Sequence, residues 1–123
     1  MAGRVLIVDD ARYMRTILRE IFTDAGWDVV ADAADGEEAA ALYREYEPDL
    51  VVLDLVMPRV GGLETMRRIL RRNDRARILV CSALGEKKLV EEVLNAGAAG
   101  YIVKPFYENQ LLRAARQALE QKK

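Results

Sequence analysis

Short apolar runs, separated by amphipathic stretches, dominate the pattern of this chain. Five of these runs are rich in β-branched or large aliphatic residues and are too short for helices: Val5–Val8, Val29–Ala31, Leu50–Leu53, Ile78–Cys81 and Tyr101–Val103. Continuous apolar runs of this kind are typical of strands that are covered on both faces, as in a parallel sheet. The pattern therefore predicts five buried strands.

Each predicted strand is followed by a stretch in which apolar residues recur with the period of a helix. The five apolar stripes are Met14, Ile17, Leu18, Ile21 and Phe22; Ala39, Leu42, Tyr43 and Tyr46; Leu63, Met66, Ile69 and Leu70; Leu89, Val90, Val93 and Leu94; and Leu111, Leu112, Ala115 and Leu119. Asp35, with Glu38 three residues later, predicts a variant of the capping box at the start of the second helix. Strands that alternate with helices predict an α/β domain with a doubly wound sheet and helices on both faces.

Length and composition fit one such domain, which we expect to span residues 1–123. Hydrophobic residues make up 51% of the chain and charged residues 32%, so a core can be buried. The net charge of −1 offers no overall basic excess to drive binding to nucleic acid or to an anionic membrane. We therefore expect neither a nucleic acid nor a membrane as partner.

Residue types that are rare or absent in the chain limit the kinds of catalytic, metal and disulfide sites that it can form. The chain has no histidine, which excludes histidine-based triads, histidine metal sites and a role as a histidine phosphocarrier. Its single cysteine, Cys81, cannot form an internal disulfide and reads as a small buried hydrophobe. No stretch approaches the roughly 20 apolar residues that span a bilayer. These features predict a cytoplasmic protein.

Polar side chains end four of the five predicted strands. Asp9 and Asp10 follow the first strand, Asp54 the third, Ser82 the fourth and Lys104 the fifth. In an open α/β sheet, ligands bind beyond the carboxyl ends of the strands, where the order of the strands reverses. We therefore expect these side chains to lie at one edge of the sheet.

Carboxylates that converge at one edge repel each other unless a counter-ion is present. Mg²⁺ suits such a place, because it binds one or two carboxylates together with waters and phosphate oxygens. A hydroxyl and an ammonium can donate hydrogen bonds to a phosphoryl group, and an aspartate can accept that group as an acyl phosphate. The residue types together predict an aspartate–Mg²⁺–phosphoryl site.

Each of these residues also has an ordinary structural interpretation. The two aspartates after the first strand could cap a helix that begins near Ala11, and Asp54 could be a loop residue. Ser82 could belong to a turn, and Lys104 could be a solvated surface charge. Their joint occurrence, each at the end of a different strand, favours the phosphoryl site.

Four separated motifs and one glycine occur in order along essentially the whole chain and include the polar residues at the strand ends. They are VLIVDD at Val5–Asp10, VVLDLVMP at Val51–Pro58, Gly62, CSA at Cys81–Ala83 and AGAAGYIVKPF at Ala96–Phe106. These motifs resemble the receiver domains of bacterial two-component response regulators. The resemblance implies a flavodoxin-like fold, with a five-stranded parallel sheet in the order 2-1-3-4-5 and five helices.

The resemblance also implies a metal site and a phosphoacceptor. Asp54 would accept a phosphoryl group from a histidine kinase. Asp10, Asp54 and the backbone carbonyl of Val56 would bind Mg²⁺ directly, and Asp9 would act mostly through water.

Three further residues have roles that the resemblance implies. Ser82 would contact the phosphoryl group, Lys104 would pair with it, and Tyr101 would be the aromatic residue whose rotamer reports activation. The bond before Pro105 would be cis.

In function, the resemblance implies a phosphorylation-dependent signalling switch that changes partner binding through its fourth helix, fifth strand and fifth helix. Such a protein is not an enzyme, beyond assisting its own phosphorylation and dephosphorylation. The chain is most similar to single-domain chemotaxis regulators of CheY type. That similarity implies a histidine kinase upstream and a target such as the flagellar motor switch downstream. It also allows a separate phosphatase as a third partner.

Other functions remain open at this point. The chain could be a single-domain intermediate of a phosphorelay, or a receiver excised from a DNA-binding regulator. A Mg²⁺-dependent phosphatase is less favoured, because the apolar Leu55 and Val56 follow Asp54 and offer no second acid or base. A flavin carrier is disfavoured because Asp9 and Asp10 stand where a hydroxyl- and glycine-rich phosphate loop is needed.

Overall fold

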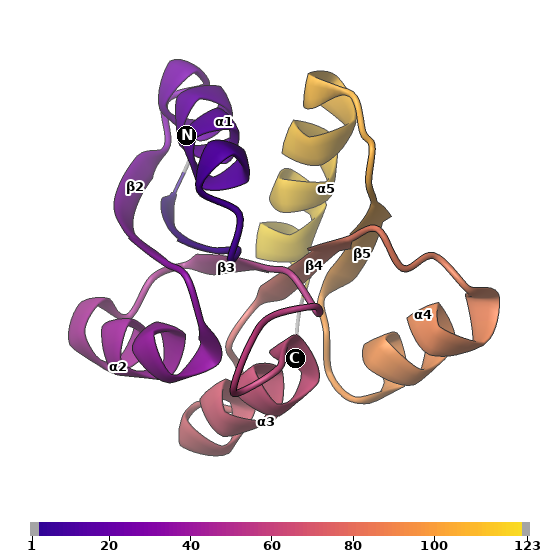
Figure 1. Cartoon of the computed structure of the whole chain (residues 1–123). Helices are drawn as coiled ribbons and strands as arrows, with labels where there is room; N and C mark the ends of the chain where they lie inside the picture. Colours follow the sequence, from indigo (N-terminus) through magenta and orange to yellow (C-terminus); the bar gives the residue numbers. More distant parts are fainter. Residues whose placement is uncertain (1–2, 122–123) are drawn as a thin grey trace.

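Five strands and five helices alternate in the computed structural model, which describes residues 3–121 (Figure 1). In chain order they are β1 Arg4–Val8, α1 Arg12–Asp24, β2 Asp28–Ala33, α2 Gly36–Tyr46, β3 Leu50–Leu53, α3 Gly62–Arg72, β4 Ile78–Ser82, α4 Lys87–Asn95, β5 Gly100–Val103 and α5 Glu108–Glu120. Every predicted strand and helix is present, with bounds that differ by a few residues.

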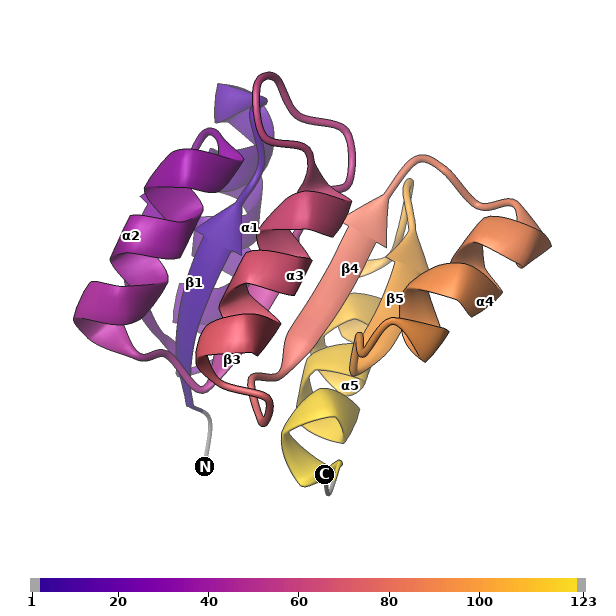
Figure 2. The ribbon, with the colours of Figure 1, turned by 90° about the horizontal axis from the view of Figure 1, so that it is seen from below.

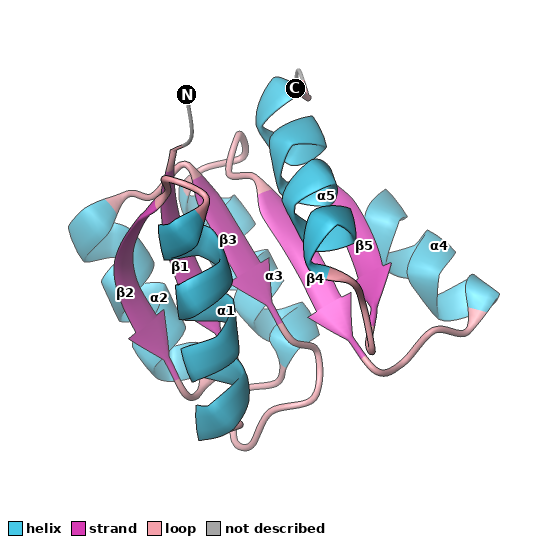
Figure 3. Cartoon of the chain, turned by 90° about the horizontal axis from the view of Figure 1, so that it is seen from above, coloured by secondary structure: helices cyan, strands magenta, loops and turns pink. Residues whose placement is uncertain are grey.

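All five strands are parallel and lie in the order β2-β1-β3-β4-β5, which confirms the predicted topology (Figure 3). Val8 of β1 pairs with Leu53 of β3, so these two strands end at the same level. Ser82 is itself the last residue of β4, because it pairs with Val103 of β5. The sequence pattern placed Ser82 just after this strand, since a hydroxyl does not extend an apolar run.

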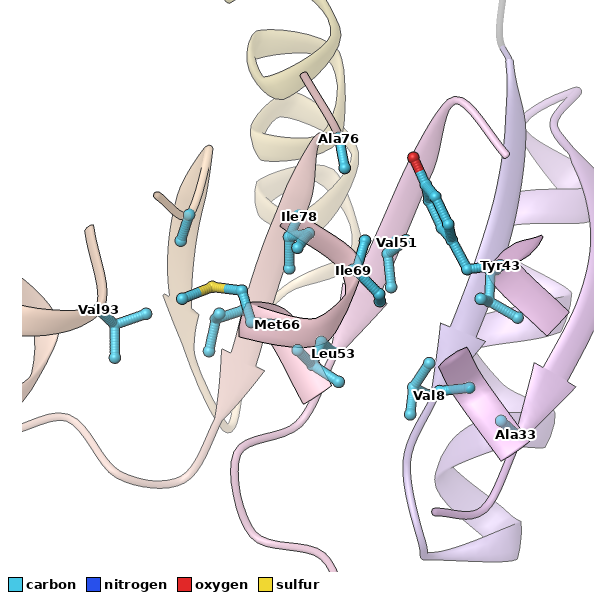
Figure 4. Packing of buried hydrophobic residues seen from close by; sticks show 14 residues of the cluster. Val8, Ala33, Tyr43, Val51, Leu53, Met66, Ile69, Ala76, Ile78 and Val93 are labelled. Atoms are coloured by element: carbon cyan, nitrogen blue, oxygen red, sulfur yellow. The ribbon is translucent and has the colours of Figure 1, made fainter. Parts of the chain in front are cut away.

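Helices cover both faces of the sheet, with α1 and α5 on one face and α2, α3 and α4 on the other (Figures 2 and 3). Successive strand residues point to opposite faces, so Leu6 and Val8 pack with α2 and α3 while Val5 and Ile7 pack with α1 and α5. Figure 4 shows the core on the α2 and α3 side, where Met66 and other apolar side chains lie against the sheet. This two-sided burial explains the uninterrupted apolar runs.

The core on the other face contains Trp27 and also Cys81, which the sequence identified as a small buried hydrophobe. Trp27 lies edge-on against Phe22, with 5.2 Å between the ring centroids. Cys81 is buried, and burial raises the pKa of its thiol to about 12. The thiol is therefore protonated at neutral pH and acts as a small apolar group.

The helix ends show how local chemistry fixes the elements beside the sheet edge. Asp35 caps α2 by accepting a hydrogen bond from the Glu38 backbone N–H, while the Glu38 carboxylate accepts from Ala34, one residue before the cap. At α1 the N-cap is Ala11, whose side chain cannot cap, but Asp9 Oδ1 accepts a hydrogen bond from the Ala11 N–H at 2.9 Å, so Asp9 supports the start of the helix while Asp10 makes no such bond among the described residues. None of the helices in residues 3–121 is long and apolar enough to cross a membrane.

The loop between β3 and α3 closes tightly on the backbone at Gly62, the first residue of α3. Its N–H donates to the Leu55 carbonyl at 3.0 Å. A Cβ at Gly62 would lie 2.3 Å from the Asp54 carbonyl oxygen and 2.4 Å from the Leu55 Cα. Only glycine allows this approach, which sets the position of the chain immediately after Asp54.

We expect Gly62→Ala to lower the free energy of unfolding, measured by urea denaturation, by about 1–3 kcal/mol, because the new methyl group must displace backbone. Helix propensity alone predicts the opposite sign, with a gain of about 1 kcal/mol. Gly61→Ala is the matched control, since its Cβ would meet only the Leu55 carbonyl oxygen at 3.8 Å. Equal unfolding free energies for the two variants would show that the close approach does not constrain the loop.

Candidate functional site

The site lies at the carboxyl edge of the sheet, between β1 and β3. These strands are where the order reverses, since β2 lies on one side of β1 and the later strands lie on the other. Asp9 and Asp54 directly follow the paired residues Val8 and Leu53, and the Asp54 N–H donates to the Val8 carbonyl at 3.0 Å. Carboxylate oxygens from Asp9, Asp10 and Asp54 all lie within 4.8 Å of one another. The sheet register therefore brings the three carboxylates together.

These carboxylates differ in burial. Asp9 is 1% exposed and Asp54 is 8% exposed, whereas Asp10 lies at the surface. The ammonium of Lys104 reaches the two buried ones, with its Nζ 2.7 Å from Asp9 Oδ2 and 3.4 Å from Asp54 Oδ2. One positive charge thus faces three negative charges, and the site has a local excess of negative charge.

The pKa of Lys104 reflects this excess of neighbouring negative charge. Burial acts to lower it, but the hydrogen bond to Asp9 and the charges of Asp9 and Asp54 outweigh burial and raise the pKa above its ordinary value. The lysine therefore remains an ammonium throughout the physiological pH range. The Lys104–Pro105 peptide bond is cis, as the resemblance implied.

The hydrogen bonds of the carboxylates leave different oxygens available. Asp9 is engaged through both oxygens, because Oδ1 accepts from the Ala11 N–H at 2.9 Å while Oδ2 binds Lys104. Asp54 Oδ1 accepts from the Val56 N–H at 3.2 Å. Among the described residues, none donates a hydrogen bond to the Asp10 side chain. Oxygen donors of this kind fit a hard divalent cation such as Mg²⁺, which would also offset the negative charge.

A second group of residues connects the site to the loop that precedes α4. Ser82 is fully buried, and its Oγ accepts a hydrogen bond from the Leu84 N–H at 3.2 Å. The half-buried Tyr101 of β5 donates its hydroxyl proton to the Leu84 carbonyl. Burial raises the pKa of Tyr101 above its ordinary value, so the hydroxyl stays protonated and remains a donor. The backbone of Leu84 is thus held from both sides.

The site also contains an interaction that the sequence pattern missed. Arg15 of α1 donates from Nη1 to the Asp9 backbone carbonyl at 2.8 Å, and its Nε lies 3.4 Å from Asp32 Oδ1 on β2. The backbone N–H of Asp9 donates in turn to the Ala33 carbonyl of β2. No local signal marks Arg15, because its contacts depend on β2 lying beside β1.

Comparison with known proteins gives a consistent set of matches. Residues 5–116 match the family described as response regulator receiver domain. The chemotaxis protein CheY of Thermotoga maritima is 43% identical over 93% of this chain and 95% of its own length. CheY of Bacillus subtilis is 41% identical over 97% of this chain and 99% of its own. A chain in the crystal structure of the CheX–CheY–BeF3–Mg complex from Borrelia burgdorferi matches with a TM-score of 0.91 and 36% identity, over 97% of this chain and 90% of that chain.

Metal should stabilise the fold by relieving repulsion within the acidic cluster, and Asp10→Asn tests this. With EDTA we expect the variant to melt at a higher temperature than the wild type, because one exposed negative charge is removed from the cluster. Mg²⁺ at about 100 times its dissociation constant should stabilise the wild type by roughly 2.7 kcal/mol and the variant by much less.

Asp28→Asn removes an equal charge at the opposite end of the sheet and is the control for this thermal denaturation experiment. It should keep the full Mg²⁺ response. An Asp10→Asn variant that melts lower in EDTA and still responds fully to Mg²⁺ would show that the three carboxylates share no ion.

Proposed function

The chain belongs to the response regulator receiver domain family, and we propose that it is a phosphorylation-dependent signalling switch whose phosphoacceptor is Asp54. The observation that carries the proposal is the convergence of Asp9, Asp10, Asp54 and Lys104 at the reversal point of the sheet. This site combines a nucleophilic carboxylate with a cation that can neutralise a phosphoryl group. The proposed receiver domain spans residues 1–123.

In the proposed reaction, a carboxylate oxygen of Asp54 attacks the phosphorus of a phosphohistidine on the kinase. The bond from phosphorus to the imidazole nitrogen breaks, the neutral imidazole leaves after taking up a proton, and an acyl phosphate remains on Asp54. The Val56 N–H and the Lys104 ammonium orient the carboxylate before the attack. Lys104 then pairs with the new phosphoryl oxygens, since its pKa keeps it positively charged.

We propose that Asp10, Asp54 and the Val56 carbonyl hold Mg²⁺ directly and that Asp9 acts mostly through water. Both oxygens of Asp9 already accept hydrogen bonds, which supports an indirect role for this residue. Asp10 is exposed and accepts no hydrogen bond among the described residues, which supports a direct one. The bound ion would supply positive charge opposite the carboxylates and the phosphoryl oxygens.

Phosphorylation would change the conformation of the protein through Ser82 and Tyr101. The Ser82 hydroxyl accepts from the Leu84 N–H and also contacts the Tyr101 hydroxyl, and its proton would be donated to a phosphoryl oxygen once that group is present. A shift of Ser82 towards the phosphoryl group would move Leu84 and weaken its bond with the Tyr101 hydroxyl. Tyr101 would then change rotamer, and the surface formed by α4, β5 and α5 would change its affinity for a partner.

The chain would act in the cytoplasm, and the partners proposed for it are a histidine kinase, a downstream target protein and, where fast switching is needed, a phosphatase. Chemotaxis is the favoured pathway, because the CheY relatives from T. maritima and B. subtilis match over nearly their whole length. In that pathway the target would be the flagellar motor switch. The CheX–CheY complex of B. burgdorferi supports regulation by a bound partner.

Asp54→Asn is the central test of the proposed phosphoacceptor. Incubation with acetyl phosphate and Mg²⁺ should phosphorylate the wild type and leave this variant unmodified, as measured by intact-protein mass spectrometry. Asp74→Asn, at an exposed loop position, should be phosphorylated like the wild type. Equal phosphate on the Asp54→Asn variant would place the phosphoacceptor elsewhere.

The lifetime of the phosphorylated form should depend on Val56 and Leu84, which follow Asp54 and Ser82 by two residues and are 55% and 41% exposed. Hydrolysis needs a water in line with the bond between phosphorus and the Asp54 oxygen. These apolar side chains cannot orient that water, so we expect slow self-dephosphorylation. Val56→Asn combined with Leu84→Glu should shorten the half-life severalfold, and by less than the about 100-fold typical of general acid–base groups.

Val56→Ala combined with Leu84→Ala is the control, since it removes bulk without adding a hydrogen-bonding group. Decay of the phosphorylated protein should be much faster in the polar pair than in this one. Equal decay rates for the polar pair and the wild type would show that these side chains do not govern the attacking water.

A further inference from the structure

Positive charge is concentrated on α3 and the loops beside it. Residues 59–77 include seven arginines, no lysine and two carboxylates, Glu64 and Asp74, so this segment carries a charge of +5. Since the net charge of the chain is −1, the remaining residues carry −6. The near-neutral total therefore conceals a strongly uneven distribution, and the absence of an overall basic excess does not describe this face.

A groove of about 560 Å³ lies between α2 and α3, which pack side by side (Figure 2). Its lining includes four arginines: Arg44 of α2, and Arg68, Arg71 and Arg72 of α3. Tyr43 and Ile69 also line the groove, and both are almost fully buried. The groove thus combines cationic walls with a base of well-packed apolar side chains.

The four guanidinium groups are not equally engaged. Glu64 Oε2 accepts hydrogen bonds from Arg68 Nε at 3.3 Å and from Arg71 Nη2 at 3.2 Å, and these bonds hold the pKa of Glu64 below its usual value. Among the described residues, no carboxylate forms an ion pair with Arg44 or Arg72, and both side chains are exposed. The groove therefore presents unpaired positive charge to solvent.

Arginine matches carboxylates and phosphates equally well in geometry, because its planar fork donates two parallel hydrogen bonds. Single-stranded nucleic acid also needs exposed aromatic rings on which bases stack. The aromatic residue of this groove, Tyr43, is 4% exposed, and its hydroxyl accepts a hydrogen bond from Asn73 Nδ2 at 3.1 Å. Glu37 also lines the groove and would repel phosphate and carboxylate ligands alike, so it does not decide between them. The buried, hydrogen-bonded ring of Tyr43 leaves no platform for stacked bases, which favours a carboxylate-bearing protein ligand.

We expect the carboxylate-bearing ligand of the groove to be a helix rather than an extended segment. Acidic side chains four residues apart on a helix lie on one face, about one turn from each other. Such a face can lie along the groove between two helices, as in other cases in which an amphipathic helix binds a groove. Glutamates on the bound helix could then reach Arg44 and Arg72 on opposite walls while apolar side chains between them cover Ala40.

We propose that the groove between α2 and α3 is a docking site for an acidic amphipathic helix of a partner protein. None of its lining residues belongs to the acidic cluster or to α4, β5 or α5. Docking here is therefore separate from phosphoryl transfer and from the proposed output surface. It would let the chain hold one partner while its phosphorylation state controls another.

Fluorescence anisotropy with a dye-labelled synthetic peptide tests the proposal. The probe is a helical peptide of about 15 residues, or about four turns, with glutamates flanking a stripe of leucines. Arg44→Glu combined with Arg72→Glu should weaken binding at least about tenfold, because both unpaired guanidinium groups are reversed in charge. Arg113→Glu combined with Arg116→Glu makes the same change in net charge on exposed positions of α5 and should stay within about twofold of wild type.

Further arms of the experiment separate the alternatives. Arg44→Gln with Arg72→Gln should also weaken binding, which covers the case in which the charge-reversed variant does not fold. No binding to the wild type, or equal losses in the groove and α5 variants, would overturn the proposal. The proposal would also be overturned if a single-stranded DNA of equal charge bound more tightly than the peptide through the same arginines. Phosphorylation by acetyl phosphate should be unchanged in the groove variants, so a failure of this proposal is distinguishable from a failure of the proposed phosphoacceptor.

Discussion

The structure depends on placing two buried carboxylates within hydrogen-bonding range of a single ammonium, with a third carboxylate beside them, at one edge of a parallel sheet. Lys104 extends from the end of β5 to Asp9 and Asp54 at the ends of β1 and β3. Two of these carboxylates are buried, where an unpaired charge is costly, so the lysine compensates part of the repulsion and leaves a negative excess. A site of this kind is ready to bind positive charge, and it ties together strands that are far apart in the sequence.

The same lysine connects the electrostatic site to the loop that precedes α4. Its backbone N–H donates to the Ser82 carbonyl at 2.9 Å, while the Ser82 hydroxyl holds Leu84. Tyr101 holds the other side of Leu84. A change in charge at Asp54 therefore acts on groups that are one or two contacts away from the loop before α4. Short connections of this type allow a local electrostatic event to change a distant surface.

Sequence patterns identified the elements and the residue types of the candidate site with few errors. Uninterrupted apolar runs predicted the strands because both faces of the sheet are covered, and Asp35 was identified as a helix cap because its hydrogen bond to Glu38 is local. The exclusion of nucleic-acid partners relied on net charge, which does not register the clustering of arginines around α3. The role of Arg15 was missed because its contacts with Asp9 and Asp32 join three different elements.

By itself, the sequence determined the α/β class, the order of strands and helices, and the presence of carboxylate, hydroxyl and ammonium groups at strand ends. The tertiary structure alone decided that Asp9 is buried and fully hydrogen-bonded while the adjacent Asp10 faces solvent. It also decided that Lys104 lies between Asp9 and Asp54, and that Arg44 meets the arginines of α3 across a groove. The physical reason is that hydrophobic period and helix caps act over a few residues, whereas burial and charge pairing depend on which strands and helices become neighbours.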